Sequence, residues 1–431
     1  MSGVVHIVGA GLAGLSCAVR LTDEGRRVAL YEAARMAGGR CRSYHDSTLG
    51  LMIDNGNHLL LSGNAAARDY ARRIGAIDAL TGPEACVFDF LDLRDGARWR
   101  LRPNASRLPW WVFFANRRAP GTGPLDYLDA GRLLFARKGA TIGETMRCEG
   151  VLWDKLWRPV LLSALNTEPA ESSATLAGAV LRETLAAGGD ACRPLVAHRG
   201  LGEAFVEPAL KTLESHGVAP RFGARLRDLV FADGRVEKLR FGDEDVALGP
   251  QDSVVFAAPA WAALETIPGL KAPDDHRAIL NVHFKFAPPP GQPRLLGLIG
   301  GLSEWLFAFE DRLSVTISGA DRLMDAPRES MAAQIWTEVV AAAGLDHRSA
   351  ASGLASDLPP WQIVKEKRAT FAATPAQDAR RPGAVTGWAN LFLAGDWTAT
   401  GLPATIEGTI RSGYRAADLA GRGAGRDAIP S

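Results

Sequence analysis

Val4-Val5-His6-Ile7-Val8 runs directly into Gly9-Ala10-Gly11-Leu12-Ala13-Gly14, and an apolar stretch follows. The first five residues predict a buried strand, and the apolar stretch predicts a helix. A strand, the pattern G-x-G-x-x-G and a helix, in that order, begin a dinucleotide-binding βαβ unit. Gly9 permits the tight turn, Gly11 lets the backbone approach a pyrophosphate, and Gly14 lets helix and strand pack closely. The first helical amides, including those of Leu12 and Ala13, would face the phosphates.

An acidic residue supports this interpretation. Val28-Ala29-Leu30-Tyr31 predicts the second strand, and Glu32 follows Gly14 by 18 residues. A carboxylate at this distance accepts hydrogen bonds from the adenosine ribose hydroxyls. Because no nearby arginine takes its place, a 2′-phosphate is disfavoured. We assign Ala33, the next residue, to the same site.

A second glycine pair indicates which dinucleotide binds. Gly38-Gly39-Arg40 follows Glu32 closely. A nicotinamide-binding unit does not need this extension. FAD binds in an extended form and needs a second backbone approach, through Gly39, and a cation such as Arg40 near its phosphates. The alternative is an ordinary glycine turn followed by a solvated arginine.

A third block lies near the other end of the chain. Asn390-Leu391-Phe392-Leu393-Ala394 predicts a buried strand that leads into Gly395-Asp396. Pro403-Ala404-Thr405-Ile406-Glu407-Gly408 then predicts another strand-to-helix turn. A helix that begins near Thr405 and Ile406 would direct its amides and its dipole at the ribityl and pyrimidine side of a flavin.

Together these blocks resemble the flavin amine oxidase and phytoene desaturase superfamily. Two further stretches, 157–167 and 401–408, are similar to the squalene-associated FAD-dependent desaturases, also called hydroxysqualene dehydroxylases. The resemblance covers nearly the whole chain. It implies a two-lobed α/β flavoprotein with a Rossmann-like FAD-binding domain and an inserted α+β substrate domain. It also implies a backbone contact to the adenine near Leu226.

The expected domains are discontinuous. We predict that residues 1–80, 200–270 and 380–431 form the FAD-binding domain, and that 81–199 and 271–379 form the substrate domain. Asp233-Gly234 predicts a hairpin in the first domain. In the second, the sequence predicts a helix from about Glu168 and another over about 328–343.

Composition agrees with an ordinary flavoenzyme. The chain has 431 residues, a net charge of +1 and five cysteines. The charge gives no electrostatic reason to expect nucleic acid, and neither a targeting segment nor a spanning helix is evident. We expect a cytoplasmic protein without a metal. The last cysteine is Cys192, so the C-terminal thioether that anchors flavin in some amine oxidases is unavailable, and FAD should be noncovalent.

One predicted strand bears on whether the enzyme oxidises amines. Leu280-Asn281-Val282-His283-Phe284-Lys285-Phe286 alternates and predicts a half-buried strand. Amine oxidases usually place a lysine on the corresponding strand near the flavin. By our register Asn281 takes that place, or Lys285 if the register slips. The departure weakens amine oxidation, and so does the absence of paired aromatic residues after Asp396.

The resemblance implies that the enzyme reduces hydroxysqualene to squalene in hopanoid synthesis, with a hydride from reduced flavin and loss of water. His58, beside the predicted flavin-binding turn at Gly56 and Asn57, could supply the proton. Asn57 and Asn166 could orient the hydroxyl, although Asn166 could instead cap the following helix. A carotenoid or phytoene-type desaturase, an amine oxidase and a non-catalytic flavin-binding lipid scaffold are the alternatives. The sequence names no electron donor.

An apolar substrate raises the question of a membrane. Leu108-Pro109-Trp110-Trp111-Val112-Phe113-Phe114-Ala115 lies between Arg107 and Arg117-Arg118. Aromatic rings beside arginines suit an interfacial foot on the inner face of the cytoplasmic membrane. The alternative is that both tryptophans fill the core of the substrate lobe.

Overall fold

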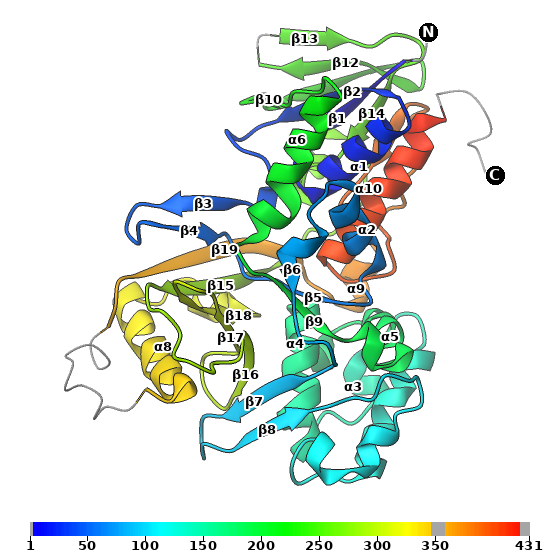
Figure 1. Cartoon of the computed structure of the whole chain (residues 1–431). Helices are drawn as coiled ribbons and strands as arrows, with labels where there is room; N and C mark the ends of the chain where they lie inside the picture. The colour runs from blue at the N-terminus through cyan, green and yellow to red at the C-terminus, as the bar shows by residue number, and fades with distance from the viewer. Residues whose placement is uncertain (1–2, 243, 346–357, 423–431) are drawn as a thin grey trace.

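The computed structural model describes residues 3–242, 244–345 and 358–422, and it shows two lobes (Figure 1). The first lobe is built on a five-stranded parallel sheet with the order β10-β2-β1-β14-β20. Its strands come from distant parts of the chain: β1 (Val4–Val8), β2 (Arg27–Glu32), β10 (Arg221–Phe222), β14 (Ser253–Phe256) and β20 (Leu391–Leu393). This mixed α/β, two-lobed architecture confirms the predicted fold class.

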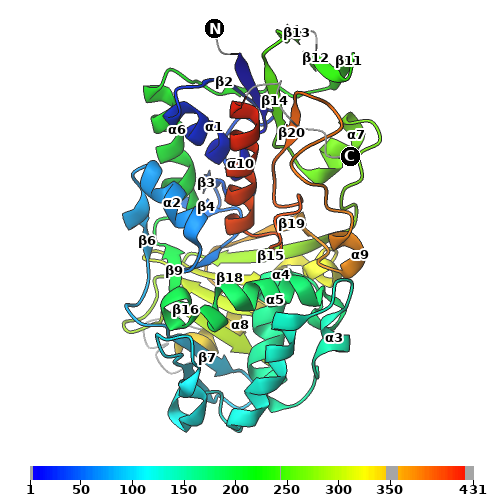
Figure 2. The same ribbon diagram turned by 90° about the vertical axis from the view of Figure 1, so that its right-hand side faces the viewer.

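Helices from both ends of the chain pack beside this sheet. Helix α1 (Leu12–Asp23) follows β1, and α10 (Ile406–Gly421) lies alongside it (Figure 2). Glycines make the approach close. A Cβ atom on Gly413 would lie 2.4 Å from the Ala13 carbonyl oxygen and 2.2 Å from the Ser16 hydroxyl oxygen. Helix α2 (Ala65–Arg73) and helix α6 (Glu207–Ser215) complete this layer.

A seven-stranded sheet forms the base of the second lobe, with the order β19-β15-β18-β17-β16-β7-β8. Two of its strands come from early in the chain and five from later, and β7 and β16 join the two groups in parallel. The strands are β7 (Phe88–Asp92), β8 (Arg98–Leu101), β15 (His276–Phe284), β16 (Leu295–Ile299), β17 (Trp305–Ala308), β18 (Leu313–Ile317) and β19 (Trp361–Phe371).

Helices cover both faces of this second sheet. Helix α8 (Arg328–Ala343), where the sequence predicted it, packs with strand residues in one apolar cluster. The other face meets the first lobe and the helices of the first insertion, which include α3 (Ile142–Thr145), α4 (Arg158–Leu165) and α5 (Ala174–Glu183). Two short helices, α7 (Ala260–Thr266) and α9 (Pro375–Asp378), lie in the connections.

Three smaller sheets connect the lobes or decorate them. One is a meander whose β11–β12 hairpin turns at Asp233-Gly234, as the sequence predicted. The other two are a two-stranded ribbon and a short three-stranded sheet. Their strands are β11 (Asp228–Ala232), β12 (Arg235–Phe241), β13 (Glu244–Ala247), β3 (Ser43–Asp46), β4 (Leu51–Asp54), β5 (Leu59–Leu61), β6 (Leu80–Thr81) and β9 (Pro194–Ala197).

Two local predictions were wrong. Helix α5 begins at Ala174 with Ser173 as its N-cap, because Pro169 belongs to a separate 3₁₀ turn over Pro169–Glu171. Strand β15 is buried on both faces from Leu280 to Phe284 rather than half-buried. Helix α8 covers one face, and the turn after β4 covers the other, so the alternation of residue types did not report exposure.

The segment 108–115 divides between core and surface. Trp111 and Val112 are buried, whereas Trp110, Phe113 and Phe114 are exposed. The expectation that both tryptophans lie in an exposed foot was therefore wrong for Trp111. Its ring packs against Tyr127 with a centroid distance of 5.1 Å.

The contact between α1 and α10 yields a stability prediction. Gly413→Ala inserts a methyl group against the backbone of α1, which should cost about 1–3 kcal/mol because the carbonyl of Ala13 cannot move away freely. Thermal unfolding should show a midpoint several degrees lower than in the wild type. Gly421→Ala, in the same helix, is the control, because its Cβ would lie at an ordinary 3.4 Å from Leu21. Equal midpoints for both variants would contradict the close approach.

Candidate functional site

The first glycine turn has an open side. Gly11 is the N-cap residue of α1 and, as a glycine, has no side chain to cap the helix amides. A Cβ at Gly11 would meet no protein atom within 4 Å. The amides of Leu12, Ala13 and Gly14 are in the first turn of the helix, where they have no intrahelical acceptor. The turn therefore offers unpaired N–H donors on a surface that a phosphate can approach.

Glu32 lies beside this turn. Its carboxylate accepts hydrogen bonds from the Ala10 amide at 2.7 Å and the Ala34 amide at 2.8 Å. These two bonds orient the carboxylate at the end of β2, and Ala33 lies between Glu32 and Ala34 in the chain. The Glu32 carbonyl accepts from the Ala224 amide at 2.9 Å, which brings the segment containing Leu226 to the same strand end.

The second glycine turn packs against the first. The Gly38 amide donates to the Ala10 carbonyl at 2.8 Å, and Gly11 and Gly38 form a β-bridge. A Cβ on Gly39 would lie 3.4 Å from the Gly11 Cα. The two turns, separated in the sequence, thus form one continuous backbone surface.

Arg40 joins this surface to the far end of the chain. Its guanidinium donates to the Asp396 carboxylate at 2.7 Å and also to the Ala369 carbonyl. The Asp396 side chain is buried, while that of Arg40 is 38% exposed. Burial opposes the charge on Arg40, but Asp396 outweighs it and keeps the arginine pKa above its ordinary value. The sequence predicted both residues for the site but not their ion pair.

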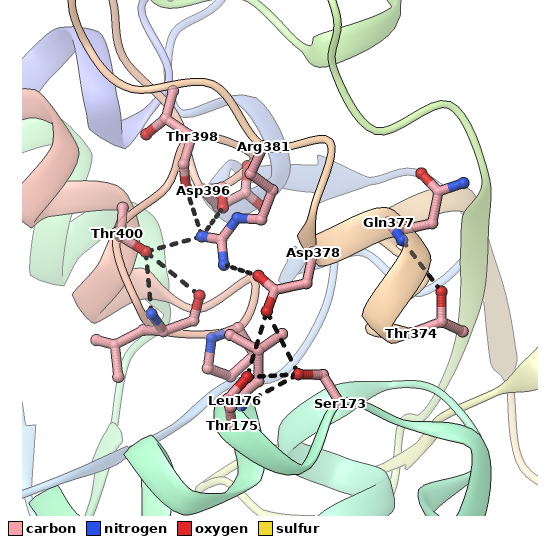
Figure 3. A network of polar contacts seen from close by, with 12 residues as sticks. Ser173, Thr175, Leu176, Thr374, Gln377, Asp378, Arg381, Asp396, Thr398 and Thr400 are labelled. Carbon is pink, nitrogen blue, oxygen red and sulfur yellow. Dashed lines mark hydrogen bonds and ion pairs between the residues drawn. The ribbon is translucent and has the colours of Figure 1, made fainter. Parts of the chain in front are cut away.

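A second arginine, which sequence reasoning missed, holds the turn that contains Asp396. Arg381 is buried and donates to the Asp396 carbonyl at 3.1 Å, the Thr398 carbonyl and the Thr400 hydroxyl (Figure 3). Its other nitrogen pairs with Asp378 at 3.2 Å. The sequence offered only the i,i+3 spacing of Asp378 and Arg381 as a signal.

The rest of the C-terminal turn leads into α10. Ser412 accepts a hydrogen bond from the Gly395 amide at 2.9 Å. Thr405 is the N-cap of α10, with its hydroxyl accepting from the Gly408 amide at 3.1 Å, so Ile406 is the first helical residue as predicted. Glu407, the second residue of α10, contacts a neighbouring helix. Its carboxylate accepts hydrogen bonds from the Ala66 and Ala67 amides at the start of α2.

The turn after β4 touches the second lobe. The Asn57 amide donates to the Asn281 side-chain oxygen at 3.2 Å, and the Asn57 side chain donates to Thr316 at 3.1 Å. Thr316 in turn donates to Asn281 at 2.8 Å. A Cβ on Gly56 would lie 3.1 Å from the Asn281 amide nitrogen. The structure therefore brings Asn281 to this turn, whereas the Lys285 ammonium group donates to the Leu49 carbonyl at 2.8 Å.

His58 and Asn166 lie in different environments. Burial and the nearby charge of Arg40 lower the pKa of His58 to about 4, so its imidazole is neutral at pH 7. Asn166 ends α4 in a left-handed conformation, with φ of 49°, so it caps the preceding helix rather than the following one. Its side chain donates to Thr370 at 3.0 Å and accepts from the Gly319 amide at 2.7 Å. These bonds tie the end of α4 to the second sheet.

A titratable group that the sequence did not single out lies next to this tie. The Glu304 carboxylate accepts a hydrogen bond from the Ser318 amide at 2.7 Å. The next amide in the chain, that of Gly319, donates to the Asn166 side chain. Burial, partly offset by the hydrogen bonds from Ser318, raises the pKa of Glu304 to about 7.

The comparisons with known proteins agree with this geometry. A family model described as flavin-containing amine oxidoreductase matches residues 12–420. The chain belongs to this family. The hydroxysqualene dehydroxylase of Rhodopseudomonas palustris is 58% identical over 420 residues, which cover 97% of this chain and 98% of the relative. A probable zeta-carotene desaturase of Synechococcus elongatus is 25% identical over 96% of this chain and 97% of the relative.

A solved structure agrees on the fold. Cyclohexylamine oxidase from Brevibacterium oxydans superposes with a TM-score of 0.70 and 17% identity, over 98% of this flavin amine oxidoreductase and 99% of that chain. Membership implies a flavin cofactor, and the chain is a flavin-dependent oxidoreductase. The 58% identity places it in the hydroxysqualene dehydroxylase branch and confirms the narrower resemblance.

The environment of Glu304 yields a prediction about pH. A carboxyl whose pKa is raised on folding favours the folded state when protonated, and this contribution is lost as the pH rises from about 4.3 through the folded-state pKa. In Glu304→Gln this pH dependence should vanish, so the free energy of unfolding of the variant relative to the wild type should rise by about 2–3 kcal/mol between pH 5 and pH 8. Thermal midpoints across this range would measure it. Glu310→Gln, on an exposed side chain, is the control, and parallel curves for wild type and Glu304→Gln would contradict the prediction.

Proposed function

We propose that this enzyme reduces hydroxysqualene to squalene in hopanoid synthesis. The observation that carries the proposal is the 58% identity to a hydroxysqualene dehydroxylase over 97% of the chain. In this proposal residues 1–80, 200–270 and 380–431 bind the cofactor, and residues 81–199 and 271–379 enclose the substrate. The two large sheets, one with strands from each set of segments, support this division.

We further propose that the flavin is noncovalent FAD. The open side of Gly11, the anchored carboxylate of Glu32 and the cation of Arg40 fit a pyrophosphate and an adenosine ribose. The N-terminus of α10 fits the electron-rich end of a flavin. The last cysteine in the sequence is Cys192, so a thiol in the C-terminal turn is not available for a covalent link.

The reaction requires the transfer of a hydride and of a proton. When bound, reduced FAD would supply the hydride that the carbon losing its hydroxyl requires. The hydroxyl leaves as water and therefore takes up one proton, so the chain must deliver that proton and keep other water away from the developing cation. Asn57, Asn281 and Thr316 form a fixed polar contact between the lobes, and the Asn57 side-chain oxygen accepts no hydrogen bond from the described residues. That oxygen is a buried acceptor without a partner, and we propose that it orients a substrate hydroxyl when the Asn57 side chain turns towards bound substrate.

His58 remains our candidate for proton transfer, but its lowered pKa limits the role that it can have. Because its pKa of about 4 leaves it neutral at pH 7, His58 would relay a proton rather than store one. Asn166 is a weaker candidate, because its amide and carbonyl groups are already used in tying α4 to the sheet.

Specific contacts disfavour the amine oxidase alternative. The strand position against Gly56 is occupied by Asn281 and not by a lysine. Trp397, which follows Asp396, is buried and donates to the Ala258 carbonyl at 3.0 Å. It is therefore held in the first lobe, and the neighbouring residues, Thr398 and Ala399, cannot complete an aromatic cage for an amine.

We also propose a peripheral location on the inner face of the cytoplasmic membrane. Within the described ranges, no helix is both long and apolar enough to cross a bilayer. Hydroxysqualene partitions into bilayers, so the enzyme must collect it at the membrane surface. The exposed residues Trp110, Phe113 and Phe114 support such a contact.

Glu32 provides a test of the cofactor proposal. Glu32→Ala removes a charged acceptor from the ribose, which should weaken FAD binding by about 1.5–3 kcal/mol, or roughly 10- to 150-fold in Kd. Titration of the apoprotein with FAD would measure it, with Glu214→Ala, on the exposed side of α6, as the control. Unchanged affinity in Glu32→Ala would show that the ribose lies elsewhere. Flavin that stays with the protein after acid precipitation would refute noncovalent binding.

The substrate proposal can be tested by anaerobic mixing, because oxygen would itself reoxidise the reduced flavin. Photoreduced holoenzyme mixed anaerobically with hydroxysqualene should recover the absorbance of oxidised flavin and form squalene in equal amount. Phytoene should leave the reduced flavin unchanged. Oxidised enzyme that is reduced by phytoene would favour the desaturase alternative, and no flavin turnover with either isoprenoid would favour the lipid scaffold.

A further inference from the structure

Large apolar side chains are exposed mainly at one place on the molecule. Of the thirteen exposed large hydrophobic residues in the described part of the chain, eight lie between residues 108 and 151. Seven of these form what we call the apolar tip: Leu108, Trp110, Phe113, Phe114, Leu125, Leu128 and Phe135. The first four belong to the segment already noted. The other three come from 125–135, which the sequence analysis did not single out.

The two segments of the apolar tip share one small core. Trp111 packs edge-on against Tyr127, and the Tyr127 hydroxyl accepts a hydrogen bond from the Ala119 amide at 3.0 Å. In the 3₁₀ helix Pro124–Phe135, Ala130 and Leu133 are buried. The same helix leaves Leu125, Leu128 and Phe135 exposed, at 77%, 68% and 86%. It is therefore apolar toward the core and toward the outside as well.

The segment that carries these apolar side chains is rich in cations. Residues 102–138 contain seven arginines and lysines but only two acids, a net charge of +5 in a chain whose total is +1. Both acids are already engaged, because Asp126 caps the Gly123 amide and Asp129 pairs with Arg132. Arg117 lies over the Trp110 ring, with its guanidinium carbon 4.9 Å from the centroid. Arg102, Arg107, Arg137 and Lys138 are exposed.

The position of the apolar tip is compatible with docking. Both ribbon views place the segment that follows β8, drawn in cyan, at the end of the second lobe farthest from β1 and β2 (Figures 1 and 2). A flat surface could meet this end of the molecule without contacting the first lobe.

We propose that the apolar tip docks on a bilayer that contains anionic lipid. Rings and aliphatic side chains at headgroup depth, with guanidinium and ammonium groups at the level of the phosphates, match the two layers of such a surface. An apolar face of a protein partner would give no reason for the excess of cations in the same segment. The inference rests on the proposed function, since a bilayer-soluble substrate gives the docking its purpose, and it extends that function by adding 125–135 to the contact.

Vesicle cosedimentation tests the inference with the holoenzyme. The wild type should bind vesicles of phosphatidylcholine with phosphatidylglycerol, and raising the salt concentration should weaken binding because the charges are exposed. Leu125→Ser with Leu128→Ser and Phe135→Ser should reduce the bound fraction at least tenfold while the protein keeps its flavin. These side chains are more than two-thirds exposed, so their replacement removes little of the core. Met52→Ser with Phe222→Ser, exposed side chains outside the tip, is the matched control.

The outcomes separate docking from catalysis. Binding that is unaffected by the triple substitution, or lost equally in the control, would overturn the inference. A triple variant that turns a wild-type dimer into a monomer without vesicles would also overturn it, because the apolar tip would then join two copies. Activity on hydroxysqualene in detergent should stay unchanged in the variant, while activity on vesicle-borne substrate falls. Wild-type protein that binds vesicles yet is inactive in detergent would refute the proposed function and leave docking intact.

Discussion

The ion pair between Arg40 and Asp396 is the contact on which the proposed cofactor site depends. It joins a glycine turn near the start of the chain to a strand end 356 residues later, at 2.7 Å. Asp396 is buried, so its charge is tolerable only with such a partner. Arg381 donates a hydrogen bond to the carbonyl of Asp396 in the same turn and forms an ion pair with Asp378. Asp378 in turn accepts a hydrogen bond from Ser173, the N-cap of α5. Through these links the placement of the cofactor surface and the docking of the second lobe are coupled.

The parts of the site that could be predicted are those with a local signature. The glycine turn after β1, Glu32 at the end of β2 and Thr405 at the start of α10 each follow from a spacing that backbone geometry imposes within a few residues. The contacts between distant segments have no such signature. Arg381 looks like any arginine after a short helix, and Glu407 accepts from the amide of Ala66, which lies 341 residues earlier in the chain. Strand β15 has an alternating sequence, yet both of its faces are covered, and only the positions of α8 and Asn57 explain why.

The same contrast holds for chemistry. The family fold accommodates enzymes that act on amines and on isoprenoids, so fold alone does not select a reaction. In this chain the residues at the junction of the lobes bear on the choice of reaction. Asn281 occupies the strand position facing Gly56, Trp397 is held in the first lobe, and the Asn57 carbonyl group is left without a protein donor among the described residues. A neutral polar contact of this kind suits a substrate hydroxyl and gives a substrate ammonium group no counter-charge.

The central claim is that a hydride replaces the hydroxyl group of an apolar alcohol. The most direct measurement is the isotope content of the product after a single turnover of photoreduced holoenzyme in D₂O, because the transferable hydrogen of reduced flavin exchanges with solvent. The account predicts squalene that carries one deuterium at the carbon that held the hydroxyl. Squalene without deuterium, or hydroxysqualene recovered unchanged while the flavin stays reduced, would contradict it.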